Sequence, residues 1–362
     1  MTANVTFGAE SISANPTIPT VSPLPAYSPR FNRVKPVIAV VAENHFTELT
    51  DYVIPYGVLS ESGVAQVFAI ATEQGPIRTF PALQVEAQTT LAEFDAQFSE
   101  GADYVVVPAV ARNKDPELLK WINGQAQKGA TMVGVCDGAW VLAHAGLLDG
   151  HKAVGHWFSF KHLEKKFPKT EWIRNTRYIA DGNVITTTGV TAAIPVCVAL
   201  VEAIAGQAQA ASLAQRLGIS NWDAAHQSQD FQLKVNDIFT AIANGLSFWT
   251  HEEIGIPIDS GVDEIALSLI ADAYSRTLRS KAFSLSASKQ PVITKHGLVI
   301  LPDRIEGKGK AVNRTLKLRN TDPPVSSFNA TLEEIEQQYG SNTAAFIALQ
   351  LEYPRRGLGH AK

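Results

Sequence analysis

Four mostly apolar runs of five residues, separated by helix-length segments, constrain the fold of this chain more than any other feature. Apolar runs of this length are typical of parallel strands that are buried on both faces. Because the expected strands alternate with helices, we predict an α/β fold with a flavodoxin-like, doubly wound parallel sheet. In such a sheet the ligand crevice lies beyond the carboxyl ends of the strands. The runs occupy residues 37–41, 67–71, 104–108 and 131–135.

Further elements are expected around this framework. Helical apolar spacing and capping residues predict four helices, and alternating residues predict a hairpin and later strands. The helices are expected at about 47–61, 116–128, 139–145 and 191–205. The hairpin is expected at 77–80 and 83–85, a strand at 153–156, and a strand pair at 178–180 and 184–186.

The length and the first residues of the chain indicate how it is divided. A chain of 362 residues suits two domains. Residues 1–35 contain five prolines among serines and threonines, which predicts an extended arm that lies on the surface or on a partner subunit, or is disordered. This arm lacks the basic start and apolar core of a signal peptide, so we expect a cytoplasmic protein. Export followed by removal of a signal remains the alternative.

Composition excludes several classes of function. The net charge is −4, with 31 basic and 35 acidic residues, and no basic face for nucleic acid is evident. No apolar stretch is long enough to span a membrane. Two cysteines exclude a disulfide framework and a zinc site of the CxxC type. We therefore expect no metal, no cofactor, no nucleic-acid partner and no membrane partner.

The second part of the chain resembles the first. Residues 282–286 and 291–300 match residues 67–71 and 76–85 at a constant offset of 215. Near the end the offset falls to 152, so about 63 residues are missing, including the counterpart of Cys136. We predict that residues 232–362 are a truncated, chemically silent copy of a domain at residues 36–231. The alternative is that unrelated βα units look alike.

Cys136 lies where the fourth strand ends and a helix begins. A helix N-terminus lowers a thiol pKa and offers backbone N–H groups to an oxyanion. Gly134 and Gly138 permit the tight turn that such a nucleophile needs. A lone cysteine is more often a packed core residue, as we interpret Cys197. The position of Cys136 at the ligand-binding edge of the sheet favours a functional role.

The residues around this turn resemble a known family. The motif is Gly134-Val-Cys136-Asp-Gly-Ala-Trp, with a second block at Ala153-Val-Gly-His156-Trp. It resembles the ThiJ/PfpI superfamily of class I glutamine amidotransferase-like proteins, and most closely isonitrile hydratase and the sensor half of AraC-type regulators. After Phe231 no helix-turn-helix pattern follows, so the DNA-binding module of those regulators is missing.

The resemblance implies roles for three residues. Cys136 would be the nucleophile or oxidisable thiol. An acidic residue on the first helix, Asp51 or less favourably Glu48, would touch that thiol and share a proton with it. His156 falls where many relatives place a histidine near the cysteine. On the sequence alone, a solvated helix residue is the better interpretation of Asp51, and only the resemblance reverses it. For His156, a packed or surface residue is an equally acceptable interpretation.

Three residues depart from the family pattern. The segment after the third strand is usually Pro-Gly-Gly, whose backbone helps to bind an oxyanion, but here Ala109 and Val110 follow the proline. A β-branched residue tolerates positive φ poorly, so we expect this half of the oxyanion hole to be altered or lost. Asp137 places a negative charge beside the thiol, which opposes thiolate formation. The N–H groups of Asp137 and Gly138 remain as candidate donors.

Three functions follow from these observations. The first is a cysteine-dependent hydrolase, hydratase or lyase that acts on a small electrophilic substrate. The second is a non-catalytic sensor of a small molecule or of redox state. The third is an interaction protein, because relatives usually dimerise. The chain would then form a homodimer, or the truncated copy would cover the dimer face and form an intramolecular pseudo-dimer. The sequence leaves open whether the chain is an enzyme.

Overall fold

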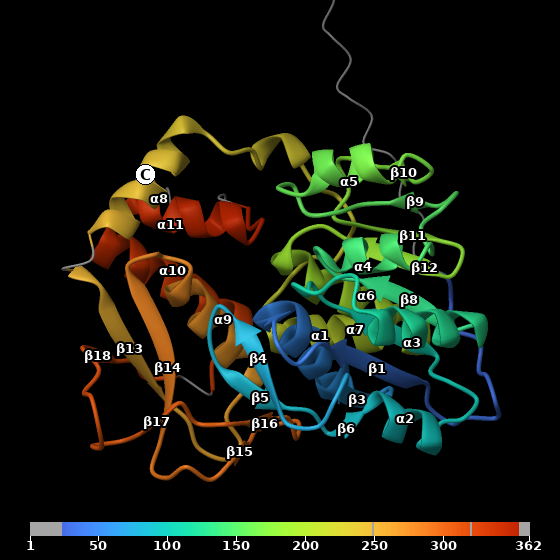
Figure 1. Ribbon diagram of the computed structural model, residues 1–362, viewed down its shortest axis with the longest axis horizontal. Coiled ribbons are helices and arrows are strands. Elements are labelled where there is room, and N and C mark those ends of the chain that lie inside the picture. The colour runs from blue at the N-terminus through green and yellow to red at the C-terminus, as the bar shows by residue number, and fades with distance from the viewer. Residues whose placement is uncertain (1–23, 248–249, 319–320, 355–362) are drawn as a thin grey trace, which may run out of the picture.

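The computed structural model describes residues 24–247, 250–318 and 321–354, and two sheets with parallel strands lie side by side in it (Figure 1). The larger sheet has seven strands, which are parallel except that β11 runs antiparallel to β12 at one edge. The four predicted core strands are neighbours in this sheet, so the predicted α/β fold is confirmed. In spatial order the strands are β11 (Tyr178–Asp181), β12 (Val184–Thr187), β8 (Thr131–Gly134), β7 (Tyr104–Val107), β1 (Val37–Ala42), β3 (Gln66–Ala71) and β6 (Thr89–Thr90).

Helices cover both faces of this sheet. Along β1, Ile38 and Val40 enter one apolar cluster, whereas Ala39 and Val41 enter another. The first cluster includes α1, α6 and α7, and the second includes α2, α3 and α4, as a doubly wound sheet requires. These helices are α1 (Leu49–Ser62), α2 (Leu91–Gln97), α3 (Pro116–Gln127), α4 (Gly138–His144), α6 (Ala193–Ala205) and α7 (Gln207–Leu217).

The prediction of a strand at residues 153–156 is wrong. Only β9 (Lys152–Ala153) pairs as a strand, and its partner is β10 (Glu171–Trp172). The N–H of Val154 donates instead to the side-chain oxygen of Thr186 at 2.8 Å, so the chain leaves the ladder there. It then continues into α5 (Phe160–Lys166), which the sequence pattern did not indicate.

A second, four-stranded sheet follows in the chain. Its central strands β13 (Glu252–Pro257) and β14 (Ser280–Ser286) are parallel and are joined by α9 (Glu264–Ser275), which repeats the order β1, α1, β3. Helices α8 and α10 were not predicted. The remaining elements here are β17 (Arg304–Ile305), β18 (Arg314–Thr315), α8 (Val235–Leu246), α10 (Pro324–Tyr339) and α11 (Ser341–Gln350).

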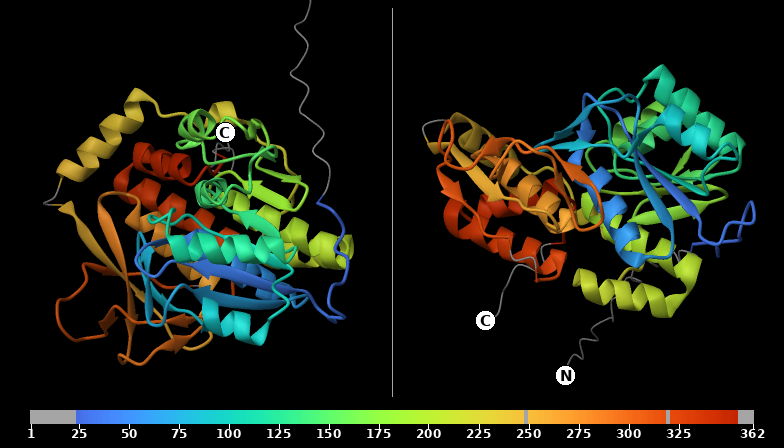
Figure 2. Two further views of the ribbon diagram at one scale, coloured as in Figure 1. Left: turned by 45° about the vertical axis from the view of Figure 1, so that its right-hand side comes forward. Right: turned by 90° about the horizontal axis from the view of Figure 1, so that it is seen from below.

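The two halves of the chain, residues 24–231 and 232–354, lie side by side (Figure 2). Helix α1 lies against α9, and a small sheet runs across the junction. In it, Ile300 pairs antiparallel with Val85, and these positions are related by the offset of 215. This pairing agrees with the predicted repeat, and the duplication itself stays a prediction. The strands of this sheet are β15 (Val292–Ile293), β16 (Val299–Ile300), β5 (Gln84–Glu86), β4 (Pro76–Phe80) and β2 (Thr47–Glu48).

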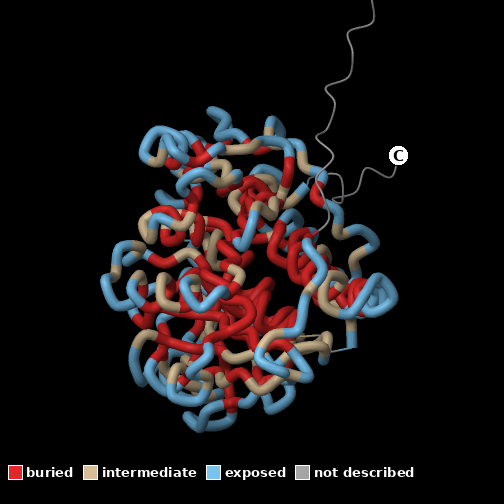
Figure 3. Tube along the Cα trace, turned by 90° about the vertical axis from the view of Figure 1, so that its right-hand side faces the viewer, coloured by how far each residue is buried: buried red, intermediate tan, exposed pale blue. Residues whose placement is uncertain are grey.

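The described part of the predicted arm lies on the first half. The N–H of Tyr27 donates to the carbonyl oxygen of Ala203, and Arg33 pairs with the buried Asp103 at 2.7 Å. Residues 1–23 of the arm lie outside the described residues. Buried segments gather in the interior, and exposed ones form the outer loops (Figure 3). Within the described ranges, no helix has both the length and the hydropathy needed to cross a bilayer.

Candidate functional site

Cys136 lies between β8 and α4, at the carboxyl edge of the large sheet, as predicted. Its φ is +55°, a left-handed conformation that costs a non-glycine residue free energy and is concentrated at functional turns. The N–H of Cys136 donates to Oγ1 of Thr187 at 3.2 Å. A Cβ on Gly138 would lie 2.0 Å from the carbonyl oxygen of Val107, so the turn requires glycine there.

Asp51 is fully buried on α1 beside this turn. Its N–H donates to the carboxylate of Glu48, which caps the helix, at 2.6 Å. Its Oδ2 accepts the N–H of Ala109 at 3.2 Å, while Oδ1 has no partner among the described residues. Burial, and then the charge of Glu48, raise the pKa of Asp51 well above its usual range. Asp51 therefore tends to retain its proton.

The thiol of Cys136 is also buried, with 7% of the residue exposed. Burial is the largest cause that raises the pKa of this thiol, and the charges of Asp51, Asp137 and Glu48 raise it further. The N–H of Asp137 acts in the opposite direction. Because several causes favour the neutral form, the thiol is held protonated near neutral pH.

A cation reaches this cluster from the second half of the chain. Arg276, at the end of α9, donates from Nη2 to Oε1 of Glu48 at 2.6 Å and from Nε to both oxygens of Asp272 at 2.9 Å. Its charge also acts on Asp51 and Cys136. We call Cys136, Asp51, Asp137, Glu48 and Arg276 the thiol cluster. No short motif could have identified Arg276, because it lies 140 residues from Cys136 in the sequence.

The titration of Asp272 gives a testable pH dependence. Burial raises the pKa of Asp272 to about 7, although the charge of Arg276 acts against this. The pKa of Asp272 is higher in the folded protein than in the unfolded chain, where it is near 4. Proton binding therefore stabilises the folded protein fully below pH 4, and this stabilisation is lost as the pH rises through about 7. Between pH 5 and pH 7 the free energy of unfolding should therefore fall, by about 2 kcal/mol from this residue.

Urea unfolding of wild type and Asp272→Asn at pH 5, 6 and 7 measures that contribution. We expect the variant to lose less stability across this range than wild type. Asp149→Asn is the control, because Asp149 pairs with Lys169 at the surface. Equal pH dependence in wild type and Asp272→Asn would contradict the assignment.

Asp137 and His156 lie together beside the thiol turn. Oδ2 of Asp137 accepts the hydroxyl of Ser159 at 2.8 Å, and Oδ1 has no partner among the described residues. Burial raises the pKa of Asp137, and the charge of His156 opposes this. Nε2 of His156 lies 3.1 Å from the carbonyl oxygen of Gln350 in the second half. His156 thus neighbours Asp137 and the second half, and no hydrogen bond between the described residues joins it to the thiol.

The N–H of Ala109 is not free to bind an oxyanion at the thiol. The N–H of Ala109 is bound by Asp51, and the carbonyl oxygen of Ala109 accepts the N–H of Glu48 at 2.9 Å. Val110 is buried and bridges to Thr47. Neither residue has positive φ. The backbone N–H and carbonyl of Ala109 are therefore both engaged with α1 and its N-cap.

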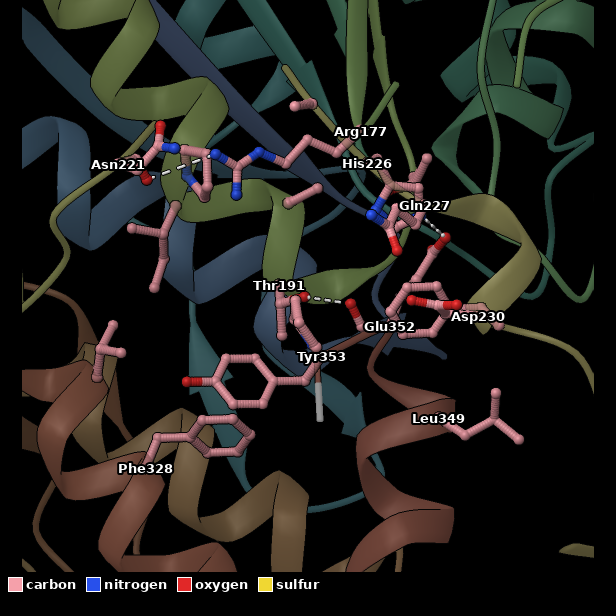
Figure 4. Close-up of a pocket in the computed structure, with 18 of the residues that line it drawn as sticks. Arg177, Thr191, Asn221, His226, Gln227, Asp230, Phe328, Leu349, Glu352 and Tyr353 are labelled. Carbon is pink, nitrogen blue, oxygen red and sulfur yellow. Dashed lines mark hydrogen bonds and ion pairs between the residues drawn. The ribbon is translucent and has the colours of Figure 1, made fainter. Parts of the chain in front are cut away.

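A cavity of about 730 Å³ lies between the two halves (Figure 4). Glu352 lies at its centre with the unusual φ of +57°. Its carboxylate accepts the N–H of Gly189 and lies 2.9 Å from Nε2 of His226. Thr191 donates its hydroxyl to the carbonyl oxygen of Glu352 at 2.9 Å. Cys136 is not among the lining residues, but Thr188, next to its partner Thr187, is.

The walls of this cavity combine apolar and polar groups, as ligand sites do. The first half contributes Arg177 and Asn221, and the second half contributes Phe328 and Tyr353 (Figure 4). This cavity could not be predicted from the sequence, because its lining residues are scattered between residues 54 and 354 and form no motif.

Comparison with known proteins relates the first half to one family. Residues 36–203 match the model of the DJ-1/PfpI family. The chain is 29% identical over 158 residues to isonitrile hydratase from Pseudomonas putida, which covers 42% of this chain and 65% of that protein. It is 31% identical over 101 residues to the HTH-type transcriptional regulator CdhR from Pseudomonas aeruginosa, which covers 28% of this chain and 30% of the regulator. The matches thus span less than two thirds of either relative.

Solved structures with similar folds include Drosophila melanogaster DJ-1beta, at 19% identity and a TM-score of 0.47. That match covers 52% of this chain and all of the DJ-1beta chain. A THiJ/PfpI family protein from Pseudomonas syringae aligns at 20% identity and a TM-score of 0.45, over 57% of this chain and 80% of the other.

Proposed function

We propose that this chain, whose residues 36–203 match the model of the DJ-1/PfpI family, binds a small molecule in the cavity between its halves, without catalysis by Cys136. The observation that carries the proposal is the cavity itself. Its volume of about 730 Å³ suits a small-molecule ligand, and its wall joins apolar side chains to a few buried polar groups. Arg177, His226 and Glu352 are the polar groups that would orient the ligand.

The state of the thiol supports binding over catalysis. A nucleophilic cysteine needs a lowered pKa, whereas burial and neighbouring carboxyl groups raise the pKa of Cys136. The Ala109 N–H, which would help to stabilise an oxyanion, is bound by Asp51. The same burial argues against a redox sensor, because sensor thiols are accessible and have low pKa values.

The cavity is connected to the thiol turn by short contacts. Glu352 binds the N–H of Gly189, which follows Thr187 and Thr188 at the end of β12. Thr187 in turn accepts the N–H of Cys136. A ligand that moves Glu352 would therefore act on the turn through one strand end. In this proposal Cys136 has a structural role beside the cavity, and the conformation of its turn changes when a ligand binds.

The test is a thermal-shift screen of small metabolites against wild type, Ala225→Trp and the control Ala211→Trp. Ala225 lines the cavity and is exposed, so a tryptophan there would fill the cavity without disturbing the core. Ala211 is exposed on α7, away from the cavity. We expect ligands that raise the melting temperature of wild type and Ala211→Trp but not of Ala225→Trp. Equal stabilisation of all three proteins would contradict the proposal.

A second candidate function is a hydratase, which the strained turn favours. Cys136 keeps a left-handed φ beside a buried Asp51 that retains a proton and has one oxygen without a partner among the described residues. In this alternative the sulfur adds to the terminal carbon of a substrate such as an isonitrile, while Asp51 gives its proton to that carbon and takes the thiol proton, which forms a thioimidate. Water then adds to the same carbon, the C–S bond breaks, the thiol regains a proton and the formamide leaves. Incubation with a small aliphatic isonitrile tests it. Formamide production that is lost in Cys136→Ser would favour this function over binding alone.

We also propose that residues 232–362 form a truncated repeat of the domain at residues 36–231, which makes the chain an intramolecular pseudo-dimer. The offset of 215 relates Val85 to Ile300, which pair directly, and relates Glu48 to Asp263, which cap α1 and α9. One thiol cluster per chain follows, because the second copy has no counterpart of Cys136.

A further inference from the structure

Helix α8 (Val235–Leu246) is packed with its polar side inward and its apolar side outward. Asp237 and Asn244 are 6% exposed, and the side-chain amide of Asn244 donates to the carbonyl oxygen of Thr277 at 2.9 Å. Val235 and Phe239 are 69% and 66% exposed. Helices in soluble proteins normally bury the apolar side, so this arrangement indicates a surface that a partner covers.

Helix α8 lies at the edge of the molecule (Figure 1), and the spacing of its exposed apolar residues places them on one face of the helix. We call these residues the α8 stripe. The stripe contains no charged side chain. Its members are Leu233, Val235, Ile238, Phe239, Ile242 and Leu246.

The spacing of four of these residues identifies the partner. Val235, Phe239, Ile242 and Leu246 are separated by four, three and four positions, which is the heptad spacing of helices that pack side by side. The order of these intervals is the same in both directions. In an antiparallel pair of two such helices, Val235 of one would meet Leu246 of the other, and Phe239 would meet Ile242. The stripe is therefore self-complementary about a two-fold axis.

We propose that α8 is the contact surface of a homodimer, in which the α8 stripes of two copies pack antiparallel. The stripe presents roughly 600 Å² of apolar surface, so a two-fold pair that covered both stripes completely would bury roughly 1,200 Å², the lower end of the range for specific interfaces. This surface is distinct from α1, which α9 of the same chain already covers.

Two other partners of the α8 stripe, a membrane surface and residues 1–23 of the same chain, fit the stripe less well. Helices that lie in a membrane surface are rich in lysine and arginine, but α8 contains neither from Val235 to Leu246. Residues 1–23 of the same chain could supply apolar side chains, but they do not repeat the heptad spacing of the stripe.

Sedimentation equilibrium of the full chain tests the proposal. We expect about twice the chain mass of 39.1 kDa for wild type at micromolar concentration, and 39.1 kDa for Phe239→Asp. Both copies lose an anchor in that variant, so its dissociation constant should rise at least ~100-fold. Phe158→Asp is the matched control, because Phe158 is equally exposed but lies outside α8, and it should remain dimeric.

A cross-linking experiment tests the register independently of folding effects. Val235→Cys and Leu246→Cys proteins are prepared separately and then mixed under mild oxidation. We expect disulfide-linked dimers in the mixture and not in either protein alone, because only the antiparallel pairing brings these positions together.

Four results would overturn the proposal. Wild type could be monomeric at 100 µM, or Phe239→Asp could remain dimeric. Wild type could also bind lipid vesicles through α8, or become dimeric only after removal of residues 1–23, which would assign the stripe to a membrane or to the arm.

Discussion

Replacement of Arg276 by methionine is expected to cost about 3–5 kcal/mol of the free energy of unfolding at pH 7, the range for a buried ion pair that loses one partner. Arg276 neutralises Glu48 and Asp272, both of which lie inside the protein. Methionine fills a similar volume but leaves these carboxylates without a cation. The loss should shrink at pH 5, because protonation can then neutralise Asp272, whose pKa is raised to about 7.

Urea unfolding of Arg276→Met at pH 5 and pH 7 measures both effects. Arg174→Met is the control, since Arg174 pairs with Glu164 at the surface and such pairs contribute less than about 1 kcal/mol. If Arg276→Met were as stable as the control at pH 7, Arg276 would not hold the thiol cluster together. The second half would then contact the thiol cluster without stabilising it.

Replacement of Gly138 by alanine is the other change with a large expected effect. The added methyl group would lie 2.0 Å from the carbonyl oxygen of Val107, so the backbone of β7 or of the thiol turn must move. We expect a loss of about 3 kcal/mol, near the upper end for overpacking in a core. Gly124→Ala in α3 is the matched control, because nothing lies near that position and alanine favours a helix by up to about 1 kcal/mol.

Chemical denaturation of both glycine variants checks this prediction. Gly138→Ala should unfold at a lower urea concentration than wild type, and Gly124→Ala at the same or a higher concentration. A Gly138→Ala protein within 1 kcal/mol of wild type would show that the turn can relax, and that its close contact with β7 is not required.

The first half could be predicted from sequence because its signals are local. The core strands at residues 37–41 and 131–135 are continuous apolar runs, and each run has one good structural interpretation. The prediction of a strand at 153–156 was wrong. The N–H of Val154 binds the side chain of Thr186 instead of a neighbouring strand, and such a contact leaves no periodic pattern in the sequence. Helix α8 was missed although its apolar residues have helical spacing. That spacing could not show that the apolar side of the helix lies outward and the polar side inward.

The site could be predicted only in part for a related reason. Cys136 is marked by a turn motif, and the structure brings Asp51 to it. The groups that set the state of the thiol come from distant segments. Arg276 acts on Glu48, and Gln350 binds His156, across the contact between the halves. A single sequence contains no pattern that pairs such residues, so the electrostatics of the site required the structure.

The pH dependence of Cys136 alkylation tests the central claim of this account most directly. Iodoacetamide labelling of the native protein, followed by mass spectrometry of the Cys136 peptide between pH 6 and pH 10, gives the rate for this thiol alone. We predict slow labelling at pH 7 that rises about tenfold per pH unit through pH 9, because the thiolate is disfavoured. A fast rate that is constant from pH 6 to pH 8, and that slows in Asp51→Asn, would show an activated nucleophile and contradict the account.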